Sequence, residues 1–278
     1  MYRHVDTRIV STALLLLLLL PASAQAQDRD WHFALGGGAR FGPIDGHVQT
    51  PAGGEPGTSS PNRPTFGELG IDDVTVIDVN GALEWRREGL YLDLQFIRPS
   101  GDATLDSTLV SQGNTFPAGT LVNADIQLDE YQLAYGHRFD LRSADVTLTP
   151  MAGAMLFNFD YRLDVKGGAS GAPSVSRAYA KAAPMLGLTL DWRPSGGPWG
   201  VEFLGSVNIP ATEAMPRGYD VEARVRYDLL RERDRELSAY VGVGFQHLQY
   251  DDANKQTLPN DINFDLGPLV TVGIEFRY

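Results

Sequence analysis

The sequence predicts an all-β fold, a single antiparallel up-and-down β-barrel of about ten strands. Apolar residues recur at every second position in about ten separate segments, the period of a strand with one apolar and one polar face. Long loops and short turns alternate between these segments, and all four Trp lie beside the short turns. Strand ends read from sequence shift by about 2–4 residues, so the pattern also allows eight or twelve strands.

Residues 1–26 have the pattern of a cleaved secretory signal. Arg3 and Arg8 give a positive start, residues 10–20 form an apolar segment, and Ala-Gln-Ala at 24–26 is a small-x-small cleavage site. The apolar segment is about a dozen residues long, whereas a membrane-spanning helix needs roughly 20. We therefore expect export and a mature barrel of residues 27–278, with cleavage after Ala24 as the alternative.

The composition excludes several classes of site. The 278 residues include no Cys, which removes disulfides and thiolate metal sites. The formal net charge is -12 and no basic run is present, which is not the pattern of a nucleic-acid-binding protein. No spacing of acidic or His residues matches a metal motif, so we expect no cofactor, no metal and no catalytic residues.

The first three predicted strands are residues 31–42, 74–86 and 90–98. Their apolar positions are Trp31, Phe33, Leu35, Ala39 and Phe41, then Ile77, Val79, Leu83 and Trp85, then Leu90, Leu92, Leu94 and Phe96. Residues 43–71 are rich in Pro, Gly, Ser and Thr without periodicity, which predicts a long surface loop. Residues 99–124 form a second long connection, whose weak alternation at both ends predicts a hairpin that continues both strands.

The next three predicted strands are residues 125–141, 145–165 and 177–192. The fifth strand changes phase. Its apolar positions are Val146, Leu148, Ala152, Ala154 and Leu156, followed one residue out of step by Phe157, Phe159, Tyr161 and Leu163. A β-bulge near residues 155–157 would place both sets outside the barrel. Without a bulge, Met155, Phe157 and Phe159 would line an apolar cavity.

The last four predicted strands are residues 199–209, 219–230, 237–250 and 261–278. Pairing Ile209 with Tyr219 would set Glu202 opposite Arg226. The closing strand is predicted to carry one apolar face made of Ile262, Phe264, Leu266, Val270, Val272, Ile274, Phe276 and Tyr278.

Seven aromatic residues fall at the level of the short turns: Trp31, Trp85, Phe139, Trp192, Trp199, Tyr227 and Tyr278. This pattern predicts an aromatic girdle at a membrane interface. Together with the even strand number, it resembles the bacterial outer-membrane β-barrel proteins in general. The resemblance implies contact with outer-membrane lipid and lipopolysaccharide. It also implies that Ile274, Phe276 and Tyr278 form a signal for the barrel-assembly machinery.

The inward face is predicted to carry charges of both signs near the short turns: Glu84, Arg86, Asp93, Arg138, Asp191, Glu202, Arg226, Glu275 and Arg277. Side chains largely fill a barrel of about ten strands, so we expect a plug of paired charges. The alternative is the constriction of a narrow porin-like channel for small solutes.

We expect a structural or surface-binding role rather than an enzyme, with residues 43–71 and 99–124 as the segments that would meet an extracellular ligand. A less favoured alternative is a hydrolase at the loop rim. There His247 lies near Asp251, Asp252, Asp261 and Asp265, and omptin-type proteases use such groups to activate water. However, His247 is in phase with the lipid-facing residues, so a solvated acidic loop is the favoured interpretation.

Overall fold

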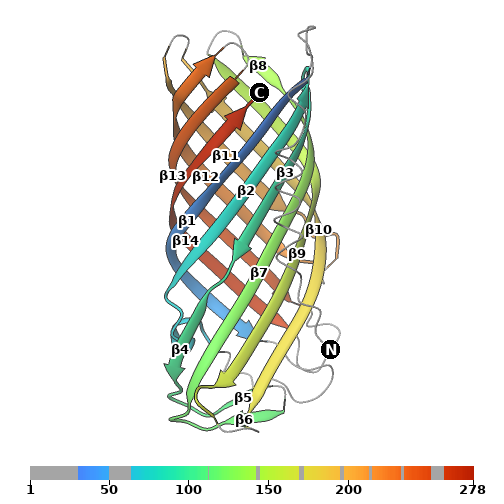
Figure 1. Ribbon diagram of the computed structural model, residues 1–278. Coiled ribbons are helices and arrows are strands. Elements are labelled where there is room, and N and C mark those ends of the chain that lie inside the picture. Colours follow the sequence, from blue (N-terminus) through green and yellow to red (C-terminus); the bar gives the residue numbers. More distant parts are fainter. Residues whose placement is uncertain are drawn as a thin grey trace, which may run out of the picture. The chain divides into compact units, whose positions relative to one another are not determined.

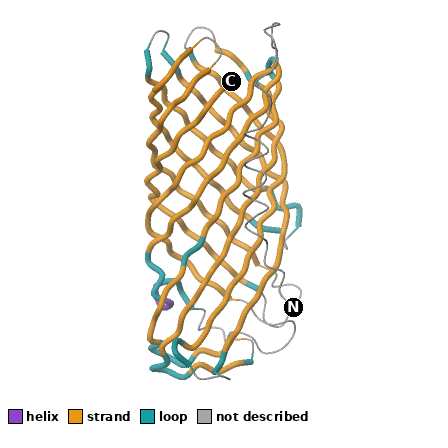
Figure 2. The backbone as a smooth tube through the Cα atoms, in the orientation of Figure 1, coloured by secondary structure: helices purple, strands orange, loops and turns teal. Residues whose placement is uncertain are grey.

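The computed structural model describes residues 31–49, 64–111, 113–141, 145–168, 172–194, 197–212, 215–232, 235–251 and 260–278. These residues form a closed antiparallel β-barrel, so the predicted fold class is confirmed (Figures 1 and 2). The predicted signal segment, residues 1–26, lies outside the described residues. Among those described, no helix is long and apolar enough to cross a membrane.

The strands are β1 (Trp31–Gln49), β2 (Asp73–Trp85), β3 (Glu88–Ile97), β4 (Ser100–Thr104), β5 (Leu109–Ser111), β6 (Asn114–Phe116), β7 (Leu121–His137), β8 (Phe139–Leu141), β9 (Val146–Val165), β10 (Ser174–Trp192), β11 (Trp199–Asn208), β12 (Arg217–Glu232), β13 (Arg235–Asp251) and β14 (Asp261–Arg277). β3 continues into β4 and β7 into β8, so the wall has ten strands. Pairing of β1 with β14 and of β7 with β9 closes the barrel.

The wall has two zones of opposite polarity. In the zone beside the short turns, at the top of Figure 1, the outward side chains are apolar and exposed, as for Leu133, Leu188 and Val241. We call this outer surface the apolar belt. In the zone beside the long loops, the outward side chains turn polar and the inward ones are apolar and buried. A belt of this kind suits lipid, whereas the second zone has the pattern of a barrel surrounded by water.

The predicted bulge in the fifth strand is wrong. β9 pairs in unbroken register with both β7 and β10. Phe157 and Phe159 are therefore fully buried inside the barrel, while the outward positions change from Leu156 to Asp160 and Arg162. The apolar residues change face because the strand leaves the belt. The alternative is right that β9 has no bulge, but Met155, Phe157 and Phe159 pack in a buried apolar core and do not line the cavity in the lumen.

A bulge does occur, in β14. The register of β14 shifts against β1 between Phe41 and Ile44, and against β13 between Gly244 and Gln246. The extra residue lies near Gly267, which has a φ of 125° that L side chains rarely adopt. The predicted single apolar face is therefore wrong for its first three members. Ile262, Phe264 and Leu266 face inward and are buried, whereas the residues from Val270 to Tyr278 alternate outward as expected.

The first predicted loop is only partly a loop. Residues 43–49 continue β1 and pair with β14. After residues 50–63, which lie outside the described residues, the chain forms a 3-10 turn, η1 (Gly67–Leu69), whose neighbours Phe66 and Ile71 are buried inside the barrel end. The prediction of a surface loop is therefore wrong for residues 64–71.

The second long connection forms the predicted hairpin. β4 pairs with the first residues of β7, and β5 pairs with β6 at the bottom of Figure 1. Phe116 at the end of this hairpin is fully buried, so the hairpin also contributes to the interior of the barrel.

A charge placed on the belt is expected to destabilise the barrel. Leu133 lies outward in the belt, and Gln127 lies on the same face of the same strand beyond it. Leu133→Lys should cost about 2–4 kcal/mol if the site is near the bilayer midplane, because a cation would face hydrocarbon. Gln127→Lys should cost little. Urea unfolding in lipid vesicles measures both, and equal costs would contradict the assigned edge of the belt.

The β14 bulge should depend on Gly267. Gly267→Ala is expected to cost about 1–3 kcal/mol, because it forces an L residue into a backbone conformation that L residues rarely adopt. The matched control is Gly205→Ala, whose added Cβ would lie 3.8 Å from Val221 Cγ1, an ordinary contact. Urea unfolding of the two variants side by side should separate them, and a stable Gly267→Ala barrel would argue against the strained bulge.

Candidate functional site

The lumen contains the groups with chemical interest, and its filling changes along the barrel axis. The long-loop half holds an apolar core, the middle holds a cluster around Arg40, and the short-turn half holds a network of ion pairs beside a cavity. The strands bring these groups together because every second residue of each strand points inward.

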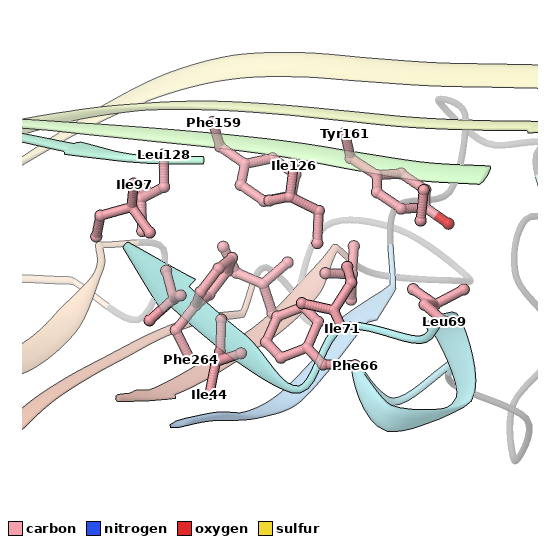
Figure 3. Close-up of a cluster of buried hydrophobic side chains, with 14 of the residues drawn as sticks. Ile44, Phe66, Leu69, Ile71, Ile97, Ile126, Leu128, Phe159, Tyr161 and Phe264 are labelled. Carbon is pink, nitrogen blue, oxygen red and sulfur yellow. The ribbon is translucent and has the colours of Figure 1, made fainter. Parts of the chain in front are cut away.

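The apolar core fills the long-loop half (Figure 3). Its aromatic rings pack across the lumen: the Phe66 and Phe264 ring centroids are 4.9 Å apart, and those of Phe159 and Phe264 are 6.2 Å apart. Side chains from η1, β1, β7, β9 and β14 contribute, including Ile44, Leu69, Ile126, Leu128 and Tyr161. The described side chains of this core are almost entirely inaccessible to solvent, as in a packed protein interior.

The Arg40 cluster consists of Arg40, Asp78, Asp220, Gln95 and Gln246, from five different strands. The Arg40 guanidinium donates to both oxygens of Asp78, at 3.1 Å each, and to both oxygens of Asp220, at 2.9 and 2.8 Å. Gln95 donates to Asp220 at 2.9 Å, and Gln246 donates to Gln95 at 2.9 Å. Arg40 is only 2% exposed, so both carboxylates compensate a fully buried cation.

Small inward residues of β1 make room for this cluster and for its neighbours. A Cβ on Gly38 would lie 2.8 Å from the hydroxyl oxygen of Tyr240, and a Cβ on Gly36 would lie 2.4 Å from Asn80 Oδ1. The Gly-rich start of β1 therefore allows long side chains from facing strands to cross the lumen.

The short-turn network joins arginines and carboxylates from β10 to β14. Arg226 contacts Glu275 at 2.8 Å, Asp191 at 3.2 Å and Glu202 at 3.3 Å. The remaining pairs are Arg277 with Glu275 at 2.6 Å, Arg224 with Glu222 at 2.7 Å, Arg193 with Asp191 at 3.0 Å, and Arg193 with Glu236 at 2.6 Å. Arg226 and Arg193 each contact more than one carboxylate, and Arg224 is bidentate to Glu222, which favours a fixed arrangement.

Five of the sequence-predicted charges, Asp191, Glu202, Arg226, Glu275 and Arg277, lie together in this network. The predicted strand pairing is off by two residues, because Val207 lies opposite Tyr219 and Glu202 lies opposite Arg224. The Glu202–Arg226 contact forms nevertheless, as a diagonal pair.

The other four predicted charges lie apart. Glu84 and Arg138 pair at 3.6 Å, and Tyr91 donates to Glu84 at 2.9 Å. Asp93 lines the cavity. Arg86 is not in the lumen: it occupies the exposed turn after β2, with a φ of 58° and its guanidinium 5.1 Å from the Trp85 ring. The alternation predicts an inward residue there because the predicted strand, residues 74–86, extends one residue beyond the observed end of β2 at Trp85.

Sequence reasoning missed the Arg40 cluster and the Glu222–Arg224 pair. All of these residues are in phase with the inward positions of their strands, so the signal was present. The charges were expected only near the short turns, and Arg40, Asp78 and Asp220 lie at the middle of the barrel.

A cavity of about 350 Å³ occupies the short-turn half. It reaches from the Arg40 cluster to the level of Arg138 and Arg277, and Asn80, Gln132 and Thr189 supply neutral polar groups to its wall. The Arg40 cluster and the apolar core lie between this cavity and the long-loop end.

The seven predicted girdle residues all point outward at the short-turn end and are exposed. Trp31 lies opposite Trp85 with the rings stacked 5.8 Å apart, and Trp199 lies opposite Tyr227 with 4.6 Å between ring centroids. Ile274, Phe276 and Tyr278 face outward on the same side of β14.

His247 lies on the outer wall. Its Nδ1 is 2.6 Å from Asp265 Oδ1, its directly opposite partner on β14, and its ring stacks on Tyr219 at 5.5 Å. Asp261 contacts His47 at 3.1 Å instead, and Asp252 lies outside the described residues. Within the described ranges no group of three or more His, Cys, Asp or Glu is placed to hold a metal ion.

The stability of the Arg40 cluster should depend on Arg40 and its two carboxylates being present or absent together. Arg40→Met is expected to destabilise the barrel by about 3–5 kcal/mol, because it leaves two buried carboxylates without their cation. The triple variant Arg40→Met, Asp78→Asn, Asp220→Asn should recover most of that loss. Urea unfolding measures both. A triple variant no more stable than Arg40→Met would contradict the argument that Arg40 is needed to offset the charges of Asp78 and Asp220.

Comparison with solved structures returns outer-membrane β-barrels. One is the outer membrane protease OmpT from Escherichia coli, 12% identical, covering 93% of this chain and 100% of that chain with a TM-score of 0.39. Another is the attachment invasion locus protein Ail of Yersinia pestis, 10% identical, covering 89% and 99% with a TM-score of 0.34. A third is the toluene transporter TodX of Pseudomonas putida, 9% identical, covering 100% and 94% with a TM-score of 0.33. No family model and no curated protein matches the sequence. The chain forms a closed antiparallel β-barrel of ten strands, and at these scores neither a family nor a role is transferred from the three proteins.

Proposed function

We propose that this outer-membrane barrel does not conduct solutes and that its role is structural or surface-binding, exerted at its long-loop end. The observation that supports the proposal is that two separate groups of side chains fill the lumen, one after the other along the barrel axis. The Arg40 cluster crosses the middle of the barrel, and the apolar core fills the half beyond it. A solute would have to displace both.

The long-loop zone supports a surface-binding role. Its outward residues are polar and its interior is a packed core, so this zone stands as a rigid platform beyond the apolar belt. Loops held on a rigid scaffold are the usual location of binding surfaces. The proposal includes an exported chain with a signal at residues 1–26, a lipid and lipopolysaccharide environment, and recognition of Ile274, Phe276 and Tyr278 by the barrel-assembly machinery.

The cavity favours a second candidate, a narrow channel. It supplies about 350 Å³ of polar space in the short-turn half, which would serve as the vestibule of a pore. Such a channel would need the Arg40 cluster and the apolar core to open together. The hydrolase alternative has less support, because the His247–Asp265 pair faces away from the lumen and the described residues bring no second carboxylate to it.

Single-channel recording tests the proposal. Purified protein added to planar lipid bilayers should give no unitary conductance steps, because the lumen is closed twice. A channel-forming peptide of known conductance, added afterwards to the same membrane, is the positive control. Stable, size-selective steps from the folded protein would overturn the proposal and favour the channel.

A further inference from the structure

The barrel wall is incomplete beside β10 in the long-loop zone. β10 is 19 residues long, whereas its neighbour β11 has only 10 and pairs with Met185 to Trp192 alone. Figure 1 shows β10 running on toward the long-loop end. Within the described ranges no strand pairs with residues 174–184 on the β11 side.

The main-chain groups on this side can be assigned. The Pro184 carbonyl accepts from the N–H of Ile209 on the β11 side at 2.9 Å, and the Pro173 carbonyl accepts from Val165 on the β9 side. Because main-chain direction alternates along a strand, Ala178, Ala180 and Ala182 direct their N–H and C=O groups to the same side as Pro184. All three residues are exposed, and no backbone hydrogen bond joins them to a described residue on that side. We call these three residues the β10 edge.

The β10 edge lies outside the lipid. An unpaired strand edge is not tolerated in hydrocarbon, since its polar groups would find no partner. The outward residues agree: they are small from Ala178 to Ala182 and become the large apolar residues of the belt from Leu186 onward. The edge therefore faces the aqueous side on which the long loops lie.

Two cations flank the edge on its inward side. Arg177, just before Ala178, and Lys181, between Ala180 and Ala182, point inward, and neither forms an ion pair with a described carboxylate. Arg177 Nε is buried without a hydrogen-bond partner among the described residues, and Lys181 Nζ lies 5.1 Å from the Tyr250 ring. This differs from the short-turn half, where each arginine of the network is paired.

From the open edge and the unpaired cations we propose that the β10 edge docks an extended acidic segment of a partner protein, which adds a strand to the wall. The added strand would hydrogen-bond to Ala178, Ala180 and Ala182, and its inward side chains would lie beside Arg177 and Lys181. The two cations are four positions apart, so the segment that fits carries acidic residues four positions apart. The inference names the partner class for the surface-binding role and rests on that proposed function.

Charge argues against a second copy of this chain as the occupant. Two β10 edges paired with each other would bring Arg177 and Lys181 of both copies together, and like charges across a strand pair are destabilising. The same cations repel basic segments and attract acidic ones, so they favour an acidic strand. They also reduce unspecific pairing of other strands with the edge.

Fluorescence anisotropy with a labelled peptide tests the proposal on the full chain folded in detergent micelles. The probe is Thr-Val-Glu-Val-Thr-Val-Glu-Val-Thr, and the comparison peptides carry Lys or Gln in place of both Glu. The acidic peptide should bind at least about tenfold more tightly than the Lys peptide. Arg177→Gln with Lys181→Gln should abolish the preference for the acidic peptide over the Gln peptide.

Two variants at one position test the main-chain contact. Ala180→Pro removes an N–H that the edge would offer, at a kind of position where Pro is tolerated, and should weaken binding at least about tenfold. Ala180→Thr keeps the N–H and should bind like the unchanged chain. Heat-modifiable gel mobility verifies that both variants are folded barrels.

No binding of the acidic peptide to the folded barrel, equal binding of the acidic and Lys peptides, or unchanged binding by Ala180→Pro would each overturn the inference. Conductance is recorded on a separate sample without peptide. A barrel that conducts would therefore contradict the proposed function. A barrel that neither conducts nor binds the peptide would contradict only the docking site.

Discussion

One constraint organises this barrel: each of its long strands passes through two environments, and its apolar residues must change face between them. In lipid, apolar side chains are favourable on the outside and the backbone is satisfied by closure of the sheet. In water, apolar side chains are favourable only inside, where they pack against one another. β9 makes the change between Leu156, which is exposed on the belt, and Phe157, which is fully buried in the core. β14 achieves the same change with a bulge at Gly267.

The interior follows from this change of face. Where the outside is apolar, the inward positions carry polar residues, and buried charges are tolerated only with partners. The network around Arg226 and the Arg40 cluster meet that condition. Where the outside is polar, the inward positions carry Phe, Ile, Leu and Val, and the lumen becomes a packed core. The Arg40 cluster lies between the core and the cavity, so the polar and apolar fillings meet at a layer in which one cation is shared by two carboxylates.

Much of the architecture could be predicted from the sequence because a period of two is a local signal. From this period follow the ten strands of the wall and the outward position of the seven girdle residues. It also follows which two strands pair across each short turn. Periodicity identifies residues that share a face, but it does not say which face is inside. The sequence therefore predicts Phe157 and Ile262 on the outside, because apolar residues in the strands of a membrane barrel usually face lipid. The register is also invisible in a single strand, which is why Ile209 rather than Val207 was placed opposite Tyr219. The Arg40 cluster needs five strands to be aligned at once, and no local pattern specifies that.

Because the strands differ in length, part of a long strand can keep an unpaired edge even though the sheet is closed. A barrel removes sheet edges only over the height that all of its strands share. β11 ends at Asn208, whereas β10 begins at Ser174 in the long-loop zone, so one side of β10 has no partner strand there among the described residues. The belt must be closed because lipid cannot satisfy main-chain polar groups, whereas in the long-loop zone water can. An unpaired strand edge is therefore tolerated only in the zone that a partner protein could reach. Arg177 and Lys181 lie beside this edge and make it positively charged. An unpaired edge in this zone costs little free energy of folding, because water hydrogen-bonds to its main chain. A docked strand would replace that water with main-chain hydrogen bonds, and the two cations would favour acidic side chains on it.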